Sequence, residues 1–210
     1  MPRCVQLSPD DYKIQRWKNG RGTTSQLLIE PADAVFPIDA FRWRISSARV
    51  NAAGAFSLFP GYDRLLVLVE GRGLDLGSLA RLSPFESVRF EGEREVDAHV
   101  ASGEEILDYG LMWKRGEFEV FCEVMESSGL QTLEAAVSGP RTLVVTALGG
   151  GVSIQVGGAS HTLAPWETLR IDFSAAEASK DWQITYGMKE PSARAIVSRL
   201  ERPKEGRSGP

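Results

Sequence analysis

The apolar and polar positions of the chain alternate over short segments, and this pattern is typical of β-strands rather than of helices. Residues 41–46 are Phe-Arg-Trp-Arg-Ile-Ser, which places the apolar side chains on one face of a predicted strand and the polar ones on the other. Residues 64–70 are almost continuously apolar, as expected of a strand that is buried on both faces. Residues 119–124 and 183–186 also predict strands. Helices are predicted only as short segments, at 130–137 and 194–202.

Two segments are near-copies of each other and predict an internal duplication. Residues 82–90 are Leu-Ser-Pro-Phe-Glu-Ser-Val-Arg-Phe, and residues 163–171 are Leu-Ala-Pro-Trp-Glu-Thr-Leu-Arg-Ile. Each copy follows an apolar segment that ends in glycines. The repeated unit is a strand, a glycine turn, a second strand, a turn with proline and a third strand. We therefore expect two similar β-units, with Pro84 and Pro165 in equivalent turns.

The repeats and the local composition predict how the chain is divided. Residues 1–128 form an N-terminal unit. Residues 129–188 form a second β-unit, which is completed by strands from the N-terminal part. Residues 189–210 are a polar tail that is rich in charge, serine, glycine and proline, and its end is expected to be disordered.

Composition and charge exclude several classes of protein. The 24 Lys and Arg residues against 28 Asp and Glu residues give a net charge of −4, without the basic face that nucleic-acid binding requires. No segment approaches the roughly 18 apolar residues of a membrane span. The first ten residues lack the apolar core of a signal peptide, and Cys4 and Cys122 are expected to be reduced thiols. These features predict a cytoplasmic protein that binds neither membranes nor nucleic acid.

The order of strands and turns in the repeat resembles the core of the cupin superfamily, most of whose members hold a metal with several histidines and a glutamate. Such a site needs several imidazoles and a carboxylate around one ion. His99 and His161 are the only histidines, one in each half, so neither half can assemble that set. Asp97 and His99 could share a strand face as an acid–base pair, but a solvated face is the simpler interpretation. We expect no metal and no other cofactor.

Residues 17–24, Trp-Lys-Asn-Gly-Arg-Gly-Thr-Thr, combine an aromatic ring, cations, an amide and two glycines. Glycines allow backbone N–H groups to approach a ligand and to form a concave anion site. The Asn-Gly pair is also typical of a β-turn, and on its own that interpretation is favoured. The segment is not a phosphate-binding P-loop, because no Gly-Lys-Ser/Thr sequence closes it.

Together with residues 41–48 and 54–64, this segment resembles the hallmark segments of the HutD/Ves family of bacterial proteins, and residues 108–116 resemble a later block. The resemblance implies an all-β fold of two tandem cupin-like β-barrel units, a bicupin of the RmlC-like jelly-roll type with few short helices. It also implies binding of a small carboxylate, such as urocanate or formylglutamate, that tempers histidine catabolism. No reaction is implied. Gly110 stands where the family pattern usually has Asn, which leaves the ligand specificity open.

Six residues are candidates for contact with such a ligand. They are Trp17, Lys18, Asn19, Arg44, Ser46 and Arg64. Arg44 and Ser46 share a strand face, and a guanidinium fits a carboxylate through two charge-assisted hydrogen bonds. The alternative for Lys18 and Asn19 is solvated surface.

Other residues near these candidates have simpler interpretations. Arg64 has an ion pair with Asp63 or Asp39 as its alternative role. Trp43, Tyr109 and Trp113 are expected to pack in the core. Asp108 and Met112 share a strand face and are assigned to the core or to an ion pair.

Three classes of function stay open. The first is a non-catalytic protein that binds a small anionic metabolite, either as a monomer or as a homodimer. The second is a metal-independent cupin enzyme, an isomerase or epimerase, which needs a proton-transfer pair such as Asp97 and His99, or His161. The third is a scaffold that serves only assembly. The scarcity of histidine favours the first class over the second, and arginines on a strand face favour it over the third.

Overall fold

The strand that the sequence predicts at residues 64–70 lies within one of two compact units. The computed structural model describes residues 1–17, 20, 22–100, 104–134 and 139–203. The middle unit comprises Tyr12–Arg115, and the terminal unit comprises Met1–Asp11 together with the chain from Gly116 onward. Within the described ranges, the helical segments are α1 (Ala175–Ala178) and the single 3-10 turn η1 (Pro9–Asp11). No helix in those ranges is long and apolar enough to cross a membrane.

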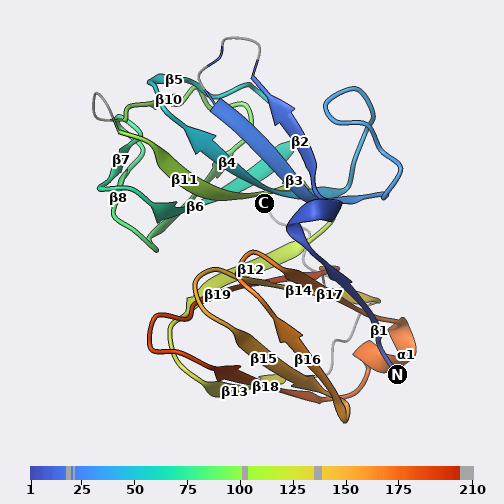
Figure 1. The fold of residues 1–210 in the computed structure, drawn as a ribbon. Coiled ribbons are helices and arrows are strands. Elements are labelled where there is room, and N and C mark those ends of the chain that lie inside the picture. Colours follow the sequence, from blue (N-terminus) through green and yellow to red (C-terminus); the bar gives the residue numbers. More distant parts are fainter. Residues whose placement is uncertain (18–19, 21, 101–103, 135–138, 204–210) are drawn as a thin grey trace. The chain divides into compact units, whose positions relative to one another are not determined.

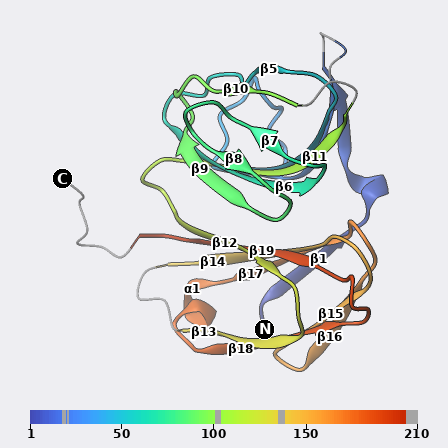
Figure 2. The same ribbon diagram turned by 90° about the vertical axis from the view of Figure 1, so that its left-hand side faces the viewer.

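The middle unit contains a six-stranded sheet with short strand pairs opposite its core face (Figure 1; Figure 2). The order of the large sheet is β2 (Lys13–Arg16), β3 (Gly22–Glu30), β4 (Trp43–Val50), β11 (Ile106–Lys114), β6 (Tyr62–Glu70) and β9 (Ser87–Glu91). The short pairs are β5 (Gly54–Ala55) with β10 (Asp97–Ala98), and β7 (Leu74–Asp75) with β8 (Arg81–Leu82). A bridge between Asp75 and His99 joins the two pairs. Apolar side chains from the large sheet and the short strands form one core.

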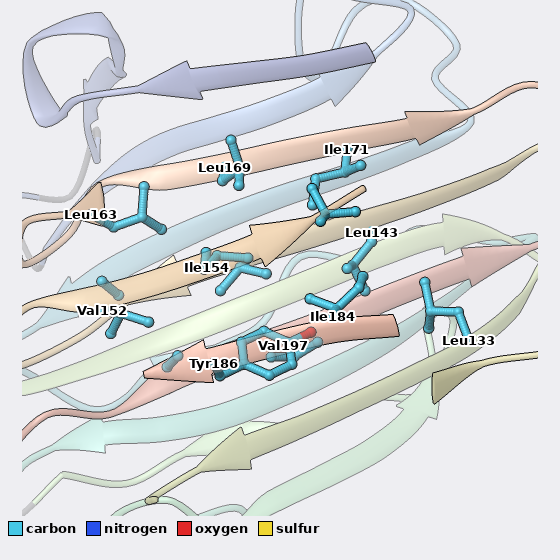
Figure 3. Close-up of a cluster of buried hydrophobic side chains, with 14 of the residues drawn as sticks. Leu133, Leu143, Val152, Ile154, Leu163, Leu169, Ile171, Ile184, Tyr186 and Val197 are labelled. Carbon is cyan, nitrogen blue, oxygen red and sulfur yellow. The ribbon is translucent and has the colours of Figure 1, made fainter. Parts of the chain in front are cut away.

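The terminal unit contains a five-stranded and a four-stranded sheet. The first has the order β1 (Arg3–Leu7), β17 (Thr168–Phe173), β14 (Arg141–Ala147), β19 (Ala195–Glu201) and β12 (Glu119–Met125). The second has the order β13 (Gly129–Leu133), β18 (Trp182–Met188), β15 (Val152–Val156) and β16 (Ala159–Leu163). Both sheets supply the buried aliphatic cluster of this unit (Figure 3). The predicted all-β fold with little helix is therefore confirmed for the described residues.

The predicted closed barrels differ from the observed sheets. In the middle unit the outer strands β2 and β9 each pair on one side only, and the same holds for β1 and β12 in the terminal unit. A barrel closes only when its edge strands pair with each other. Over the part of the chain that the structure describes, the sheets are therefore open.

The two turns that contain Pro84 and Pro165 have the same backbone conformation. The residue after each proline has a positive φ, 70° in the first copy and 64° in the second, which is uncommon for a residue other than glycine. In the first copy, the Phe85 N–H donates to the carbonyl of Leu68 in β6 at 2.6 Å. In the second copy, the Trp166 N–H donates to the carbonyl of Ala147 in β14 at 2.7 Å. The expected equivalence of the two prolines is confirmed, and Leu68 corresponds to Ala147.

The pairing of strands extends this correspondence beyond the turns. The order β4-β11-β6-β9 in the middle unit matches β12-β19-β14-β17 in the terminal unit. The short strands β5, β10, β7 and β8 match β13, β18, β15 and β16, since the bridge between Asp75 and His99 stands where β15 pairs with β18. Positions in one unit can therefore be compared with positions in the other.

Two helical predictions are wrong in the described residues. Residues 129–133 form β13, which pairs with β18, and residues 135–138 of the predicted helix lie outside the described part. Residues 195–201 form β19, which pairs with β14 on one side and β12 on the other. Both ladders satisfy the backbone of this segment, so its polar Ser198 and Arg199 are accommodated in a central strand. Residues 204–210 lie outside the described part.

The two compact units divide the chain at residues 11–12 and 115–116, whereas the sequence repeats predict a boundary after residue 128. The difference follows from β12, which pairs with β19 of the terminal unit. The N-terminal strand β1 likewise pairs with β17 of that unit.

The glutamate of each repeated segment closes its own turn. The Glu86 carboxylate accepts the Ser83 N–H at 2.7 Å, and the Glu167 carboxylate accepts the Ala164 N–H at 2.9 Å. Changing either glutamate to alanine removes this bond, and we expect the free energy of unfolding to fall by about 1 kcal/mol in each variant. Urea unfolding measures the change. Glu91→Ala in the edge strand β9 is the control, and an equal loss in that variant would contradict the prediction.

Candidate functional site

Arg44 of β4 and Arg64 of β6 lie directly opposite Met112 of β11, one on each side. Residues that are directly opposite in neighbouring strands lie on the same face of a sheet, so these three side chains share a face. Leu66 and Leu68 share that face of β6 and belong to the core of the middle unit. Both guanidinium groups are therefore carried by the core face of the large sheet.

Arg44 is held in place by hydrogen bonds and by an aromatic ring. Its side chain is 5% exposed. Its Nε donates to Gln26 Oε1 at 2.8 Å, and its Nη1 donates to Ser46 Oγ at 3.0 Å. The guanidinium carbon lies 3.9 Å from the centroid of the Phe36 ring. Burial, and then the charge of Arg64, lower the pKa of Arg44 to about 10, so the group stays a cation at neutral pH.

Arg64 lies among phenylalanine rings. Its guanidinium carbon is 4.7 Å from the centroid of Phe56, 5.1 Å from that of Phe90 and 5.9 Å from that of Phe59. Its Nη1 donates to the carbonyl of Ser57 at 3.0 Å. Burial lowers the pKa of Arg64 to about 10, so this group also keeps its charge at neutral pH.

Neither guanidinium forms an ion pair with a carboxylate of the described residues. Asp63, one of the partners considered for Arg64, pairs instead with Arg89 and Arg115. Asp39, the other, accepts a backbone N–H within its own loop at 2.8 Å. Two cations are thus held close enough for one to lower the pKa of the other, without a carboxylate at ion-pair distance. Such an arrangement favours a bound anion.

Asp108 is a buried carboxyl group on the same face of the sheet. It is 4% exposed and lies opposite Ala48 and Leu68 in the neighbouring strands. Its Oδ1 accepts the Ala48 N–H at 3.1 Å. Burial raises the pKa of Asp108 to about 7, although this hydrogen bond and the charges of Arg64 and Arg44 oppose the rise. The carboxyl group is therefore about half protonated near pH 7.

Of the Trp17–Thr24 segment, the structure describes Trp17 and Gly20, which lie between β2 and β3, and Gly22–Thr24, which begin β3. The Gly20 N–H donates to the Trp17 carbonyl at 3.0 Å, and the Trp17 N–H donates to the Gly22 carbonyl at 3.0 Å. The indole Nε1 of Trp17 donates to Thr24 Oγ1 at 2.8 Å, and the ring packs against the core of the middle unit. Lys18 and Asn19 lie outside the described residues. Of the six candidates, the structure brings together Arg44, Ser46 and Arg64.

The residues expected in the core are buried. Trp43 is 2% exposed, and Tyr109 and Trp113 are fully buried. Met112 belongs to a small apolar cluster with Phe41.

The two histidines lie in different units and in unlike surroundings. Asp97 and His99 are both exposed, which fits a solvated strand face. His161 pairs through its backbone with Ile154 in the terminal unit. The described residues contain no group of three His, Cys, Asp or Glu side chains that could hold a metal ion.

The corresponding face of the terminal unit carries a buried apolar cluster and one arginine (Figure 3). Arg199 lies opposite Phe121 and Leu143, as Met112 lies opposite Arg44 and Arg64, and it pairs with Glu201. Because Leu68 corresponds to Ala147, Arg64 corresponds to Leu143, which is fully buried in the aliphatic cluster. Asp108, which lies opposite Leu68, corresponds to Ala195, which lies opposite Ala147. The positions that match Arg64 and Asp108 thus hold apolar residues in the terminal unit. Burying a charge opposes folding, so the charges of the middle unit are not required by the fold.

Sequence reasoning did not identify Gln26, Phe36 or the unusual state of Asp108. Gln26 lies opposite Ser46 only because of the register of β3 and β4, which shifts at a bulge between Gln26 and Leu28. Phe36 comes from the loop that precedes β4. An Asp within an apolar strand is the one signal that the sequence offered, since a buried carboxyl group needs a partner or a raised pKa.

Comparison with known proteins places the chain in a family. The HutD family model matches residues 9–186. An uncharacterized 21.2 kDa protein in the hutC 3′ region of Pseudomonas putida is 28% identical over 177 residues, which cover 82% of this chain and 88% of that protein. This relative connects the chain with hut genes.

Solved structures agree with this assignment. A conserved protein of unknown function from Pseudomonas aeruginosa PAO1 matches with a TM-score of 0.81 and 26% identity, over 95% of this chain and 99% of its own. HutD from Pseudomonas fluorescens SBW25, in a formate condition, matches with a TM-score of 0.74 and 21% identity, over 96% and 100%. YhhW from Escherichia coli, at 9% identity and a TM-score of 0.63 over 96% of this chain and 99% of its own, shares the fold alone. The chain belongs to the HutD family.

Proposed function

We propose that the middle unit binds a small carboxylate and that the protein is a non-catalytic, metal-independent binding protein that modulates histidine catabolism. One observation carries the proposal. Arg44 and Arg64 are held on a core face without a carboxylate partner among the described residues, at a place where the terminal unit has apolar residues. A ligand that supplies a negative charge would offset the unfavourable burial of Arg44 and the partial burial of Arg64.

The surroundings of the two arginines suit a carboxylate with a carbon skeleton. Gln26 and Ser46 accept hydrogen bonds from Arg44 and so fix the direction of its guanidinium. Phenylalanine rings beside both arginines supply apolar contacts. Sites for small molecules combine such apolar walls with a few fixed polar groups.

The relatives suggest which carboxylates to consider. The hutC-region relative connects the chain with genes named for histidine utilisation, and the Pseudomonas fluorescens HutD structure is described with a formate condition. Formate, urocanate and formylglutamate are therefore the first ligands to test. The matched strand orders of the two units also support a bicupin derived from one duplicated cupin-like unit.

A binding titration tests the proposed function. Protein freed of metal by chelation is titrated with formate, urocanate and formylglutamate, and its melting temperature is followed. A ligand that binds the folded state at 100 times its Kd stabilises the protein by about 2.7 kcal/mol, so the melting temperature should rise with concentration. Chloride, an anion without a carboxylate group, is the control for charge. Formamide, which resembles formate but carries no charge, is the control for shape. If no carboxylate changes the melting temperature, the proposal is wrong.

The same titration distinguishes binding from catalysis. The alternative, a metal-independent isomerase or epimerase, needs a group that exchanges a proton near neutral pH, and Asp108 has a pKa in that range. On the binding proposal, the carboxylate is recovered unchanged after long incubation. Conversion of the ligand to an isomer would instead support the enzyme.

A further inference from the structure

We infer that Gly110 determines which carboxylates the site accepts, because it leaves the core face of β11 open beside the two arginines. The inference deepens the proposed function and rests on it. It adds a class of ligand, namely carboxylates with a carbon skeleton larger than that of formate.

Gly110 lies beside the three residues Arg44, Met112 and Arg64, which are directly opposite one another in the sheet. It is opposite Ser46 in β4 and Leu66 in β6, two residues before Met112, which lies between Arg44 and Arg64. Along β11 every residue is buried except Gly110, which is partly exposed, and the last residue, Lys114. The strand is therefore open at one interior position, on the face that carries both guanidinium groups.

The usual structural reasons for a glycine within a strand do not apply here. Gly110 is not among the glycines with a positive φ. A Cβ at this position would lie 3.7 Å from Ser46 Oγ and 3.8 Å from the Ser46 carbonyl oxygen, both ordinary contact distances, and would meet nothing closer. A strand glycine that is required neither by its backbone conformation nor by close packing suggests the approach of a ligand.

The terminal unit shows what the same position holds when the core is filled. Leu66 corresponds to Val145, and the partner of Val145 in β19 is Val197. Val197, the counterpart of Gly110, is 2% exposed and belongs to the aliphatic cluster (Figure 3). The middle unit thus lacks a whole side chain where the terminal unit packs one into its core.

The residues around Gly110 indicate that the carbon atoms of the ligand occupy the space where a side chain of residue 110 would lie. Ser46 Oγ, the atom nearest to the absent Cβ, accepts a hydrogen bond from Arg44. A carboxylate held by Arg44 therefore has its skeleton beside the bare backbone of Gly110. Formate has no carbon atom beyond its carboxylate and therefore does not occupy the space beside Gly110.

A size series of carboxylates tests the inference with Gly110→Ala and Gly110→Val. The probes are formate, propionate and pentanoate, which differ in chain length and share one charge. Gly110→Val is expected to lower the affinity for pentanoate about tenfold or more, by filling the space that its chain needs, and Gly110→Ala to have a smaller effect. The affinity for formate should stay within about threefold in both variants. Valine also suits a strand better than glycine, so the melting temperature should not fall.

The outcomes separate this inference from the proposed function. If Arg44→Met weakens binding while Gly110→Val leaves the order of the three affinities unchanged, the role of Gly110 is wrong and the anion site stands. An equal loss of all three probes in Gly110→Val would also overturn the role of Gly110. If wild-type protein binds none of the probes, both the proposed function and this inference are wrong.

Discussion

Replacing Arg44 by methionine is expected to lower the affinity for carboxylates about tenfold or more, while the melting temperature stays the same or rises. A hydrogen bond to a charged group contributes about 1.5–3 kcal/mol, and its loss accounts for the expected drop in affinity. Methionine keeps much of the apolar length beside Phe36, while the buried charge disappears. Arg44 has no carboxylate at ion-pair distance among the described residues, so its removal breaks no ion pair. The Asp108 carboxyl, whose pKa both arginines lower, keeps Arg64 as a cationic neighbour.

Arg64→Met should have the same effect on binding, since Arg64 shares the face and the charge of Arg44. Arg49→Met is the matched control. It lies in β4 with Arg44 but forms exposed ion pairs with Glu70 and Glu105, which contribute little to stability. Isothermal titration and thermal unfolding of the three variants measure the two effects. A variant at Arg44 or Arg64 that unfolds easily while its folded fraction binds normally would identify that arginine as structural.

The sequence predicted the strands better than it predicted their partners. Alternation placed Arg44 and Ser46 on one strand face, and the repeat placed Pro84 and Pro165 in equivalent turns. Alternation does not determine the register between strands, which depends on the packing of the whole core. The approach of Arg44, Arg64 and Asp108 depends on the pairing of β4, β11 and β6, which come from distant parts of the chain. The site therefore became visible only with the fold.

The errors at the C-terminal end have a related cause. The segment 195–201 contains serine, arginine and glutamate among its apolar residues, so its composition resembles that of an exposed segment. In the structure it is a central strand whose backbone is paired on both sides. Local composition does not report such long-range pairing, because the stability of a strand comes mainly from its neighbours. The Gly129–Leu133 strand was mistaken for a helix for the same reason.

Asp108→Asn is expected to be more stable than the wild type above about pH 7, and the difference should shrink toward about pH 4. Burial raises the pKa of Asp108 to about 7 in the folded state, whereas an unfolded aspartate has a pKa of about 3.9. Between these two pH values the folded state binds more protons than the unfolded state. Asp108 therefore makes the wild type less stable as pH rises from about 4 to about 7, and the loss is constant above that range. Three pKa units correspond to roughly 4 kcal/mol, as an upper limit.

Urea unfolding at several pH values measures the difference between the two proteins. The other carboxyl groups titrate in both proteins, so the difference isolates Asp108, and Asn keeps an oxygen that can accept the Ala48 N–H. Asp97→Asn, at an exposed position in β10, is the control for replacing a carboxylate by an amide. Parallel curves for the wild type and Asp108→Asn would show that Asp108 is ionised in the folded protein at neutral pH.

Asp108→Asn also tests whether the protonation of Asp108 is coupled to binding of the proposed carboxylate. The charges of Arg44 and Arg64 hold the pKa of Asp108 below the value that burial alone would give. A bound carboxylate offsets these charges, so the pKa of Asp108 rises and binding takes up a proton near pH 7. Carboxylate affinity of the wild type should then fall as pH rises above about 7, whereas that of Asp108→Asn should stay constant. Titrations in two buffers of different ionisation enthalpy detect the proton, and its absence in the wild type would separate Asp108 from the anion site.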